Sequence, residues 1–131
     1  MFPSPSQRFA LGPSLSRKRE RGKTIPLLLA LLQLLAGERA LGAGADFLKT
    51  STGKVGQGAT LDATRVLLEV VRDAGHGAVK ASGGVRTAAQ AAEYLALADE
   101  VMGAGWATPE RFRIGASSLV DDILARLGAP R

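Results

Sequence analysis

The chain contains no cysteine and only one histidine among its 131 residues. Without cysteine it can form neither a disulfide nor a thiolate metal site. His76 stands between Gly75 and Gly77 in a predicted helix-to-strand turn, where a solvent-exposed loop residue is the ordinary interpretation. We therefore expect neither a histidine-based metal site nor a serine-histidine-aspartate triad.

Aromatic residues are also scarce, with one Trp, one Tyr and four Phe, none of them interleaved with basic residues. The net charge of +5 nevertheless raises the question of nucleic-acid binding. Residues 1–23 hold six of the 17 Lys and Arg but only one of the 12 Asp and Glu, so the rest of the chain carries 11 of each sign. A nucleic-acid-binding domain spreads basic residues over a folded face and adds aromatic residues for stacking. We therefore expect no nucleic-acid partner.

No apolar run is long enough to cross a bilayer as a helix. The longest extends from Leu27 to Ala36, whereas a span needs about 20 residues. A basic start, this run and Ala43-Gly44-Ala45 together imitate a secretory signal with its cleavage site. A secreted or membrane-associated protein, directed by residues 17–36, is therefore one alternative. Because cleavage there would cut into the first predicted strand, we favour a cytoplasmic protein with no membrane partner.

The composition divides the chain into three parts. Residues 1–23 mix Pro, Ser, Gly and Arg without an apolar period, which predicts a disordered basic leader. Residues 24–41 are either an apolar helix that packs on a sheet or an unrelated leader. Residues 42–131 form the folded domain, which has the size of a single domain.

Within this domain, short apolar runs alternate with helical patterns. We predict strands at residues 46–49, 78–81 and 112–114, and helices at residues 60–75, 87–102 and 119–127. Thr87 and Gln90 form a capping-box signal at the second helix. The apolar stripes expected to face the core are Leu61, Val66, Leu67, Val70 and Val71 on the first helix and Ala91, Tyr94, Leu95, Ala98 and Val101 on the second.

This order of elements predicts an α/β fold. The strand starts are 32 and 34 residues apart, and strands separated by crossover helices build a parallel sheet. Three strand-helix units are too few to close a (β/α)₈ barrel, which needs about 200 to 250 residues. The chain could supply the last three-eighths of such a TIM barrel.

Two lysines stand at the ends of the first two predicted strands. Lys49 and Lys80 occupy the same register position, so their side chains should converge at the carboxyl end of the sheet, where α/β folds place reactive groups. Two ammonium groups in one partly desolvated site oppose each other's charge, which favours the neutral amine at one of them. A neutral amine can attack an aldehyde and form a Schiff base, whose protonated imine accepts electrons when a carbon–carbon bond breaks.

The turns after the three strands share a composition suited to phosphate. Each combines glycine with a hydroxyl group or a cation, and two of them lead directly into helices. Glycine lets backbone N–H groups approach an anion, and helix N-termini favour negative charge. The three turns are Thr52-Gly53-Lys54, Gly83-Gly84-Val85-Arg86 and Gly115-Ala116-Ser117-Ser118.

These motifs resemble the C-terminal part of deoxyribose-phosphate aldolase, a class I aldolase with a TIM-barrel fold. The resemblance covers about residues 42–128 and is carried by A-D-F-L-K-T-S-T-G-K, V-K-A-S-G-G-V-R-T and F-R-I-G-A-S-S-L, in this order and spacing. It implies reversible cleavage of 2-deoxy-D-ribose 5-phosphate into acetaldehyde and D-glyceraldehyde 3-phosphate, a step of deoxyribonucleotide catabolism, without metal or organic cofactor.

The same resemblance implies a role for each site residue. Lys49 would be the Schiff-base lysine, and Lys80 the second lysine, which tunes it. A phosphorylated sugar or aldehyde is the expected small-molecule partner. The residues that match the phosphate-binding positions are Gly53, Lys54, Gly83, Gly84, Val85, Arg86, Gly115, Ser117 and Ser118.

The chain also departs from this family. The first five strands of the barrel, including an aspartate that acts in proton transfer, have no counterpart in residues 1–41. Loss of a positioned acid or base slows a reaction by roughly 10²- to 10⁴-fold. We therefore expect a truncated aldolase, either assembled as a homo-oligomer or completed by a second chain. The alternative is an inactive fragment that retains only the phosphate site.

Overall fold

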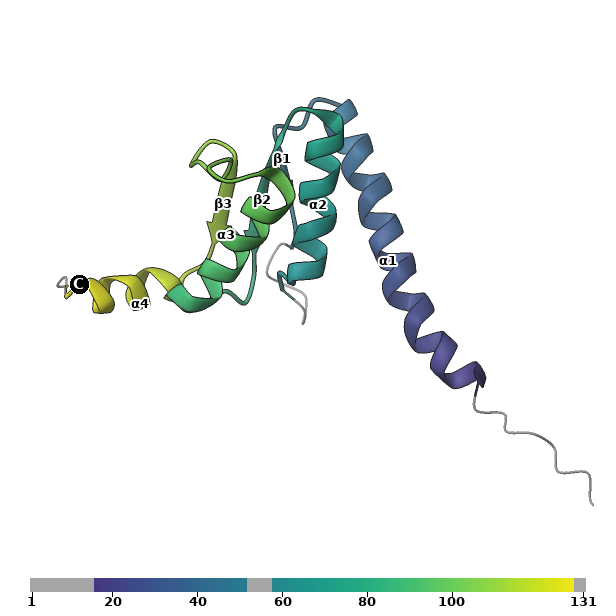
Figure 1. Ribbon diagram of the computed structural model, residues 1–131, viewed down its shortest axis with the longest axis horizontal. Coiled ribbons are helices and arrows are strands. Elements are labelled where there is room, and N and C mark those ends of the chain that lie inside the picture. Colours follow the sequence, from purple (N-terminus) through teal and green to yellow (C-terminus); the bar gives the residue numbers. More distant parts are fainter. Residues whose placement is uncertain (1–15, 52–57, 129–131) are drawn as a thin grey trace, which may run out of the picture.

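The structure, a computed structural model, describes residues 16–51 and 58–128, with side chains from Leu27 on. It confirms the predicted α/β class. Three parallel strands, β1 (Phe47–Lys49), β2 (Ala78–Ser82) and β3 (Phe112–Gly115), form a sheet in the order β1-β2-β3. Two helices, α2 (Leu61–Ala74) and α3 (Ala88–Met102), connect consecutive strands (Figure 1).

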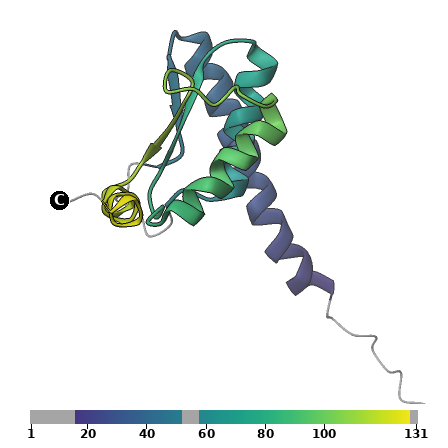
Figure 2. The same cartoon turned by 60° about the vertical axis from the view of Figure 1, so that its left-hand side comes forward.

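Helices cover one face of this sheet. Besides α2 and α3, the long helix α1 (Ser16–Gly42) lies on this side, and Figure 2 shows the opposite face without any described helix over it. The alternation of side chains along a strand explains the difference. Leu48, Val79 and Phe112 face the helices and are buried, whereas Lys49 and Arg113 face the other way and are exposed.

The core lies between the sheet and the helices. Leu68 and Val79 are fully buried there, together with Thr64, whose hydroxyl donates to the carbonyl of Thr60 at 2.9 Å. The Tyr94 hydroxyl on α3 donates to the carbonyl of Ala59 at 3.0 Å. This bond ties the loop before α2 to α3.

Both helix caps follow the predicted pattern. Thr60 caps α2 by accepting from the N–H of Ala63, and Thr87 and Gln90 form a complete capping box on α3. The predicted apolar stripes are correct only in part. Leu61 and Leu95 are exposed, while Leu68 and Leu97, the neighbours of predicted positions, are buried.

The N-terminal part differs from the prediction. Residues 1–15 lie outside the described part, but α1 begins at Ser16, so residues 16–23 are helical where disorder was predicted. Arg, Lys and Glu, which dominate this stretch, are strong helix formers even without an apolar period. Residues 24–41 continue the same helix, in accord with the predicted apolar helix.

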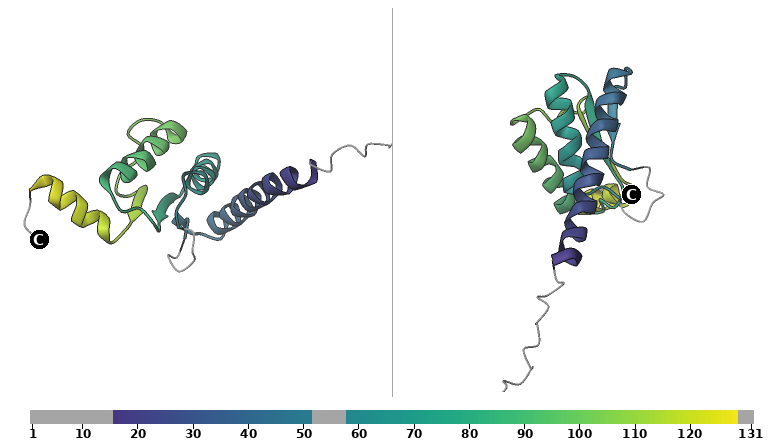
Figure 3. Two further views of the ribbon diagram at one scale, coloured as in Figure 1. Left: turned by 90° about the horizontal axis from the view of Figure 1, so that it is seen from below. Right: turned by 90° about the vertical axis from the view of Figure 1, so that its right-hand side faces the viewer.

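α1 packs against α2 and β1 through its last turns. Gly37 is buried, and a Cβ atom there would lie 3.2 Å from Leu48 Cδ1 and 3.3 Å from Val70 Cγ1, so the helix approaches closely because this residue has no side chain. Leu41, one turn later, is also buried. Further toward the N-terminus the helix leaves the domain (Figure 3), and the side chains exposed there are Leu27, Leu28, Leu29, Leu31, Leu32 and Leu35.

Within the described part of the chain, no helix is both long enough and apolar enough for a bilayer crossing.

The last helix, α4 (Ser118–Leu127), begins beyond the carboxyl end of β3 and projects to one side (Figure 1). Two interactions hold its first turns: Leu119 is buried, and the carboxylate of Asp122 accepts from the backbone N–H of Ala88 at 2.8 Å. Asp122 also pairs with Arg126 at 3.0 Å. The N-terminus of α3 therefore fixes the position of α4.

A first prediction concerns Gly77, which precedes β2. Its φ is +99°, and a Cβ atom there would lie 2.7 Å from Leu41 Cδ2, whereas Gly75 has a φ of +73° with open space around it. Gly77→Ala should destabilise the fold by about 2 kcal/mol or more, because backbone strain and crowding of Leu41 add. Gly75→Ala, with strain alone, should cost about 1 kcal/mol. Urea unfolding measures both, and equal losses would contradict the Leu41 contact.

A second prediction concerns Asp122. The pKa of its carboxyl lies below the usual value, chiefly because the N–H of Ala88 donates to it. Partial desolvation raises this pKa, and the hydrogen bond and charge of Arg126 lower it. A lowered folded-state pKa stabilises the protein above the unfolded value of about 3.9, and this stabilisation is lost as the pH falls through the folded-state pKa.

Asp122→Ala should therefore lower the urea midpoint at pH 7, and the difference from wild type should shrink as the pH falls below the unfolded value and through the lowered folded-state pKa. Asp122→Asn, which keeps an acceptor oxygen but no charge, should lie between the two at pH 7. A difference between wild type and Asp122→Ala that is constant over this pH range would contradict the role of the carboxylate.

Candidate active site

Lys49 and Lys80 are direct partners across the parallel pair of β1 and β2. Their side chains therefore lie on the same face of the sheet, the face opposite α1, α2 and α3. One detail of the prediction is wrong: Lys49 is the last residue of β1, but Lys80 is the third of five in β2, which continues to Ser82. The strand runs on because Ala81 and Ser82 pair with Ile114 and Gly115 of β3.

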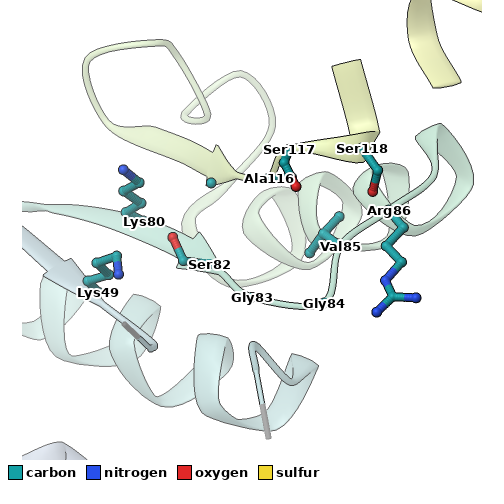
Figure 4. Close-up of a pocket in the computed structure, with 11 residues that line it drawn as sticks. Lys49, Lys80, Ser82, Gly83, Gly84, Val85, Arg86, Ala116, Ser117 and Ser118 are labelled. Atoms are coloured by element: carbon teal, nitrogen blue, oxygen red, sulfur yellow. The ribbon is translucent and has the colours of Figure 1, made fainter. Parts of the chain in front are cut away.

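Lys49 and Lys80 line one end of a cavity of about 430 Å³. The predicted convergence of their side chains is not seen, since Figure 4 shows the two nitrogens pointing in different directions. The figure shows the two lysines on neighbouring strands, with the turns after β2 and β3 extending away from them. Lys49 is exposed and its amine donates to the carbonyl of Ser51, while Lys80 is half-buried.

Nine of the predicted site residues line this cavity. They come from the ends of all three strands and from the first turn of α4, and they are Lys49, Lys80, Gly83, Gly84, Val85, Arg86, Gly115, Ser117 and Ser118. The other two, Gly53 and Lys54, lie outside the described residues. The two described turns thus line one cavity together with Lys49 and Lys80.

Glycines allow the loops at this site to approach one another. Gly83 and Gly84 have φ of +99° and +82° in the turn after β2. A Cβ atom on Gly58 would lie 2.4 Å from the carbonyl oxygen of Gly83, and the N–H of Ala59 donates to that oxygen at 2.8 Å. The end of the β1–α2 loop therefore packs directly on the glycine turn.

Gly115 keeps space open on the cavity side of the sheet. A Cβ atom at this position would lie 2.3 Å from Ser82 Oγ and 2.9 Å from Lys80 Cε. Any other residue would press on both side chains. Gly115 therefore leaves room for the side chains of Lys80 and Ser82.

The two helix N-termini at the cavity differ in how their backbone donors are used. On α3, the N–H groups of Arg86 and Thr87 donate to the Gln90 side chain, and the N–H of Ala88 donates to Asp122. On α4, the described N-cap residue Ser117 makes no side-chain capping bond. Helix N-termini favour anions, and the Ser117 side chain at the start of α4 is not used as a cap.

Three residues of this face were missed by the sequence analysis. Thr50 joins the strand ends: its N–H donates to the carbonyl of Lys80 at 3.2 Å, and its hydroxyl donates to the carbonyl of Ser82 at 3.1 Å and accepts from the Ser82 N–H at 2.9 Å. Ser82 itself lines the cavity. The sequence position of each residue could have indicated it. Thr50 directly follows Lys49, and Ser82 is two residues after Lys80 and therefore on the same face of β2.

Arg113, the third missed residue, pairs in register with Lys80 and adds a cation to this face. Its guanidinium lies 4.3 Å from the centre of the Phe47 ring, and its Nε donates to the carbonyl of Pro109 at 3.1 Å. These contacts hold the Arg113 side chain between the loop before β3 and Phe47 of β1. Within residues 16–51 and 58–128, no group of three His, Asp or Glu could hold a metal ion.

Solved structures of aldolases share the fold of this chain. The apo form of a putative deoxyribose-phosphate aldolase from Toxoplasma gondii ME49 matches with a TM-score of 0.63 and 25% identity over 69% of this chain and 37% of its own. A structure described as "QR15, an Aldolase" matches with a TM-score of 0.53 and 30% identity over 75% and 39%. A second structure of a putative deoxyribose-phosphate aldolase from T. gondii ME49 shares the fold, with a TM-score of 0.61, 23% identity and coverage of 76% and 40%. The chain thus spans about two-fifths of the length of these structures.

The sequence model of the DeoC/LacD family aldolases matches residues 18–123. This match includes most of α1, which favours a helix of the domain over an unrelated leader. It also extends over all three strands and the two lysines that pair across them. The chain therefore belongs to the DeoC/LacD family of aldolases.

Proposed function

We propose that this chain carries the Schiff-base and phosphate sites of a deoxyribose-phosphate aldolase, which cleaves 2-deoxy-D-ribose 5-phosphate reversibly into acetaldehyde and D-glyceraldehyde 3-phosphate. One observation carries the proposal: Lys49 and Lys80 pair in register at one end of a cavity whose other walls are the glycine turn and the first turn of α4. An amine pair and an anion site in one cavity suit a phosphorylated aldehyde.

In the proposed reaction, the neutral amine of Lys49 attacks the C1 aldehyde, and loss of water gives a protonated imine. The imine accepts the electrons of the C2–C3 bond while the C3 hydroxyl loses its proton, which releases D-glyceraldehyde 3-phosphate and leaves an enamine. Protonation of the enamine at C2 and hydrolysis then release acetaldehyde and restore Lys49.

The phosphate would be bound at the opposite end of the cavity. Arg86 supplies charge, the glycine turn after β2 supplies close backbone approach, and the N-terminus of α4 supplies its dipole beside Ser117 and Ser118. Gly53 and Lys54 complete the proposed phosphate site. The cavity volume suits a small sugar phosphate.

We further propose that the three strand-helix units are the last three of a TIM barrel. The sheet face that carries Lys49 and Arg113 would then be the interior of the barrel, and further units would cover it. These units would come from a second chain or from assembled copies of this one. A cytoplasmic role in deoxyribonucleotide catabolism, without metal, organic cofactor or nucleic acid, accompanies the proposed reaction.

A second candidate function is phosphate binding without catalysis. It is favoured by the exposure of Lys49, because an amine in water stays protonated and is then a poor nucleophile. In this case the cavity would bind phosphorylated compounds but form no covalent intermediate.

Reductive trapping separates the two candidates. Acetaldehyde and sodium borohydride should attach an ethyl group to Lys49, because the reduced imine cannot hydrolyse, and peptide mass spectrometry locates the label. Lys49→Leu should abolish the label at this site, whereas the control Lys23→Leu, outside the proposed site, should not affect it. No label in the wild type, or a total label unchanged in Lys49→Leu, would exclude the Schiff-base mechanism and leave phosphate binding.

Phosphate binding is tested at Arg86. Arg86→Ala should weaken the binding of inorganic phosphate about tenfold, because hydrogen bonds to a charged group are worth about 1.5 to 3 kcal/mol when formed and Arg86 is partly screened by water. Isothermal titration calorimetry measures the affinities. Arg111→Ala, an exposed arginine that does not line the cavity, is the matched control. Equal weakening in both variants would indicate general electrostatic attraction and no defined phosphate site.

A further inference from the structure

Ser82 is the buried polar side chain that the proposed reaction does not use. It is 6% exposed, and its hydroxyl oxygen has no hydrogen-bond partner among the described residues. Its backbone is fully engaged, since Thr50 both accepts from its N–H and donates to its carbonyl. An unpaired hydroxyl at such a site is uncommon, because buried polar groups normally have a partner. A bound molecule would supply that partner.

The Ser82 side chain belongs to the wall of the cavity. Ser82 lies on the same face of β2 as Lys80, and Figure 4 shows its oxygen pointing from the strand toward β3, on the side of Lys80. Across the sheet it pairs with Gly115, where a Cβ atom would lie only 2.3 Å from Ser82 Oγ. The absence of a side chain at Gly115 therefore gives this buried hydroxyl its space in the cavity wall, beside the Lys80 side chain.

The position of Ser82 along the strand indicates which part of a ligand it meets. It is two residues beyond Lys80, or roughly 6.6 Å along the strand, and it directly precedes the turn formed by Gly83 and Gly84. It thus lies between the amines and the turns proposed to bind phosphate, nearer to the turns. A sugar phosphate bound across the cavity has its middle hydroxyl groups at this level.

We propose that the Ser82 hydroxyl forms a hydrogen bond with the ligand hydroxyl on the carbon next to the phosphorylated carbon. Ser82 is then a specificity-determining residue, which selects phosphorylated compounds that carry this hydroxyl over those that lack it. The assignment rests on the proposed function for the orientation of the ligand, with its phosphate at the turns. It does not require that Lys49 form a Schiff base.

Two unreactive ligands test the proposal. D-glycerol 3-phosphate carries the hydroxyl next to its phosphorylated carbon, whereas 3-hydroxypropyl phosphate lacks it, and neither has an aldehyde. Calorimetry on the full chain should give a preference for D-glycerol 3-phosphate of about two- to tenfold, the range of one hydrogen bond between neutral groups. Ser82→Ala should bind both ligands equally and bind inorganic phosphate as the wild type does.

Each other outcome overturns the assignment. A preference that persists in Ser82→Ala, no preference in the wild type, or no binding of D-glycerol 3-phosphate by the wild type would each do so. Urea unfolding of Ser82→Ala shows whether its fold is retained; should it be lost, Ser82→Cys, which keeps a side chain of similar shape with only a weak donor, replaces it with the same expected loss of preference.

The measurement also separates this proposal from the reaction itself. Lys49→Leu should keep the preference of the wild type, because the Ser82 contact is remote from the amine. If borohydride trapping fails but the preference exists and depends on Ser82, the chain is a binding protein for hydroxylated phosphate compounds. If trapping succeeds without a preference, the Schiff-base function stands and the role of Ser82 is overturned.

Discussion

The register between β1 and β2 is the constraint on which the site depends. Leu48 pairs with Val79 on the helix side, and so Lys49 pairs with Lys80 on the other side. A slip of one residue would bury Lys49 among the core leucines and valines, because strand side chains alternate between faces. Burial of Leu48 against α1 and the hydrogen bonds of Thr50 to β2 both oppose such a slip. The same strand register therefore determines both the packing of the core and the positions of Lys49 and Lys80.

Beyond the strands, the site is shaped by where side chains are missing and where backbone donors are already used. Gly58 and Gly83 let two loops touch through their backbones, and Gly115 leaves open space above β2. Asp122 occupies the N-terminus of α3 from the next helix along the chain, which links the first turn of α4 to that of α3. The cavity thus has one helix end whose N–H groups are used internally and one whose N-cap side chain makes no capping bond.

Much of this fold could be predicted because its signals are local. Thr60 and Thr87 mark helix starts through their capping bonds, and the equal spacing of the strands implies parallel pairing. The extent of β2 beyond Lys80 was missed because it depends on pairing with β3. Leu95 was assigned to the core because apolar periodicity does not show how wide a face of the helix is buried. The roles of Thr50 and Ser82 arise only when distant strands meet. The participation of Gly53 and Lys54 stays a prediction.

The exposed leucines of α1 have a practical consequence for anyone who purifies the chain. All six are exposed in the middle of the helix, and an apolar patch of this kind binds other apolar surfaces. In concentrated solution those surfaces are column resins, tube walls and other molecules of the same chain. Low protein concentration and a mild detergent during preparation would reduce aggregation and adsorption through these leucines.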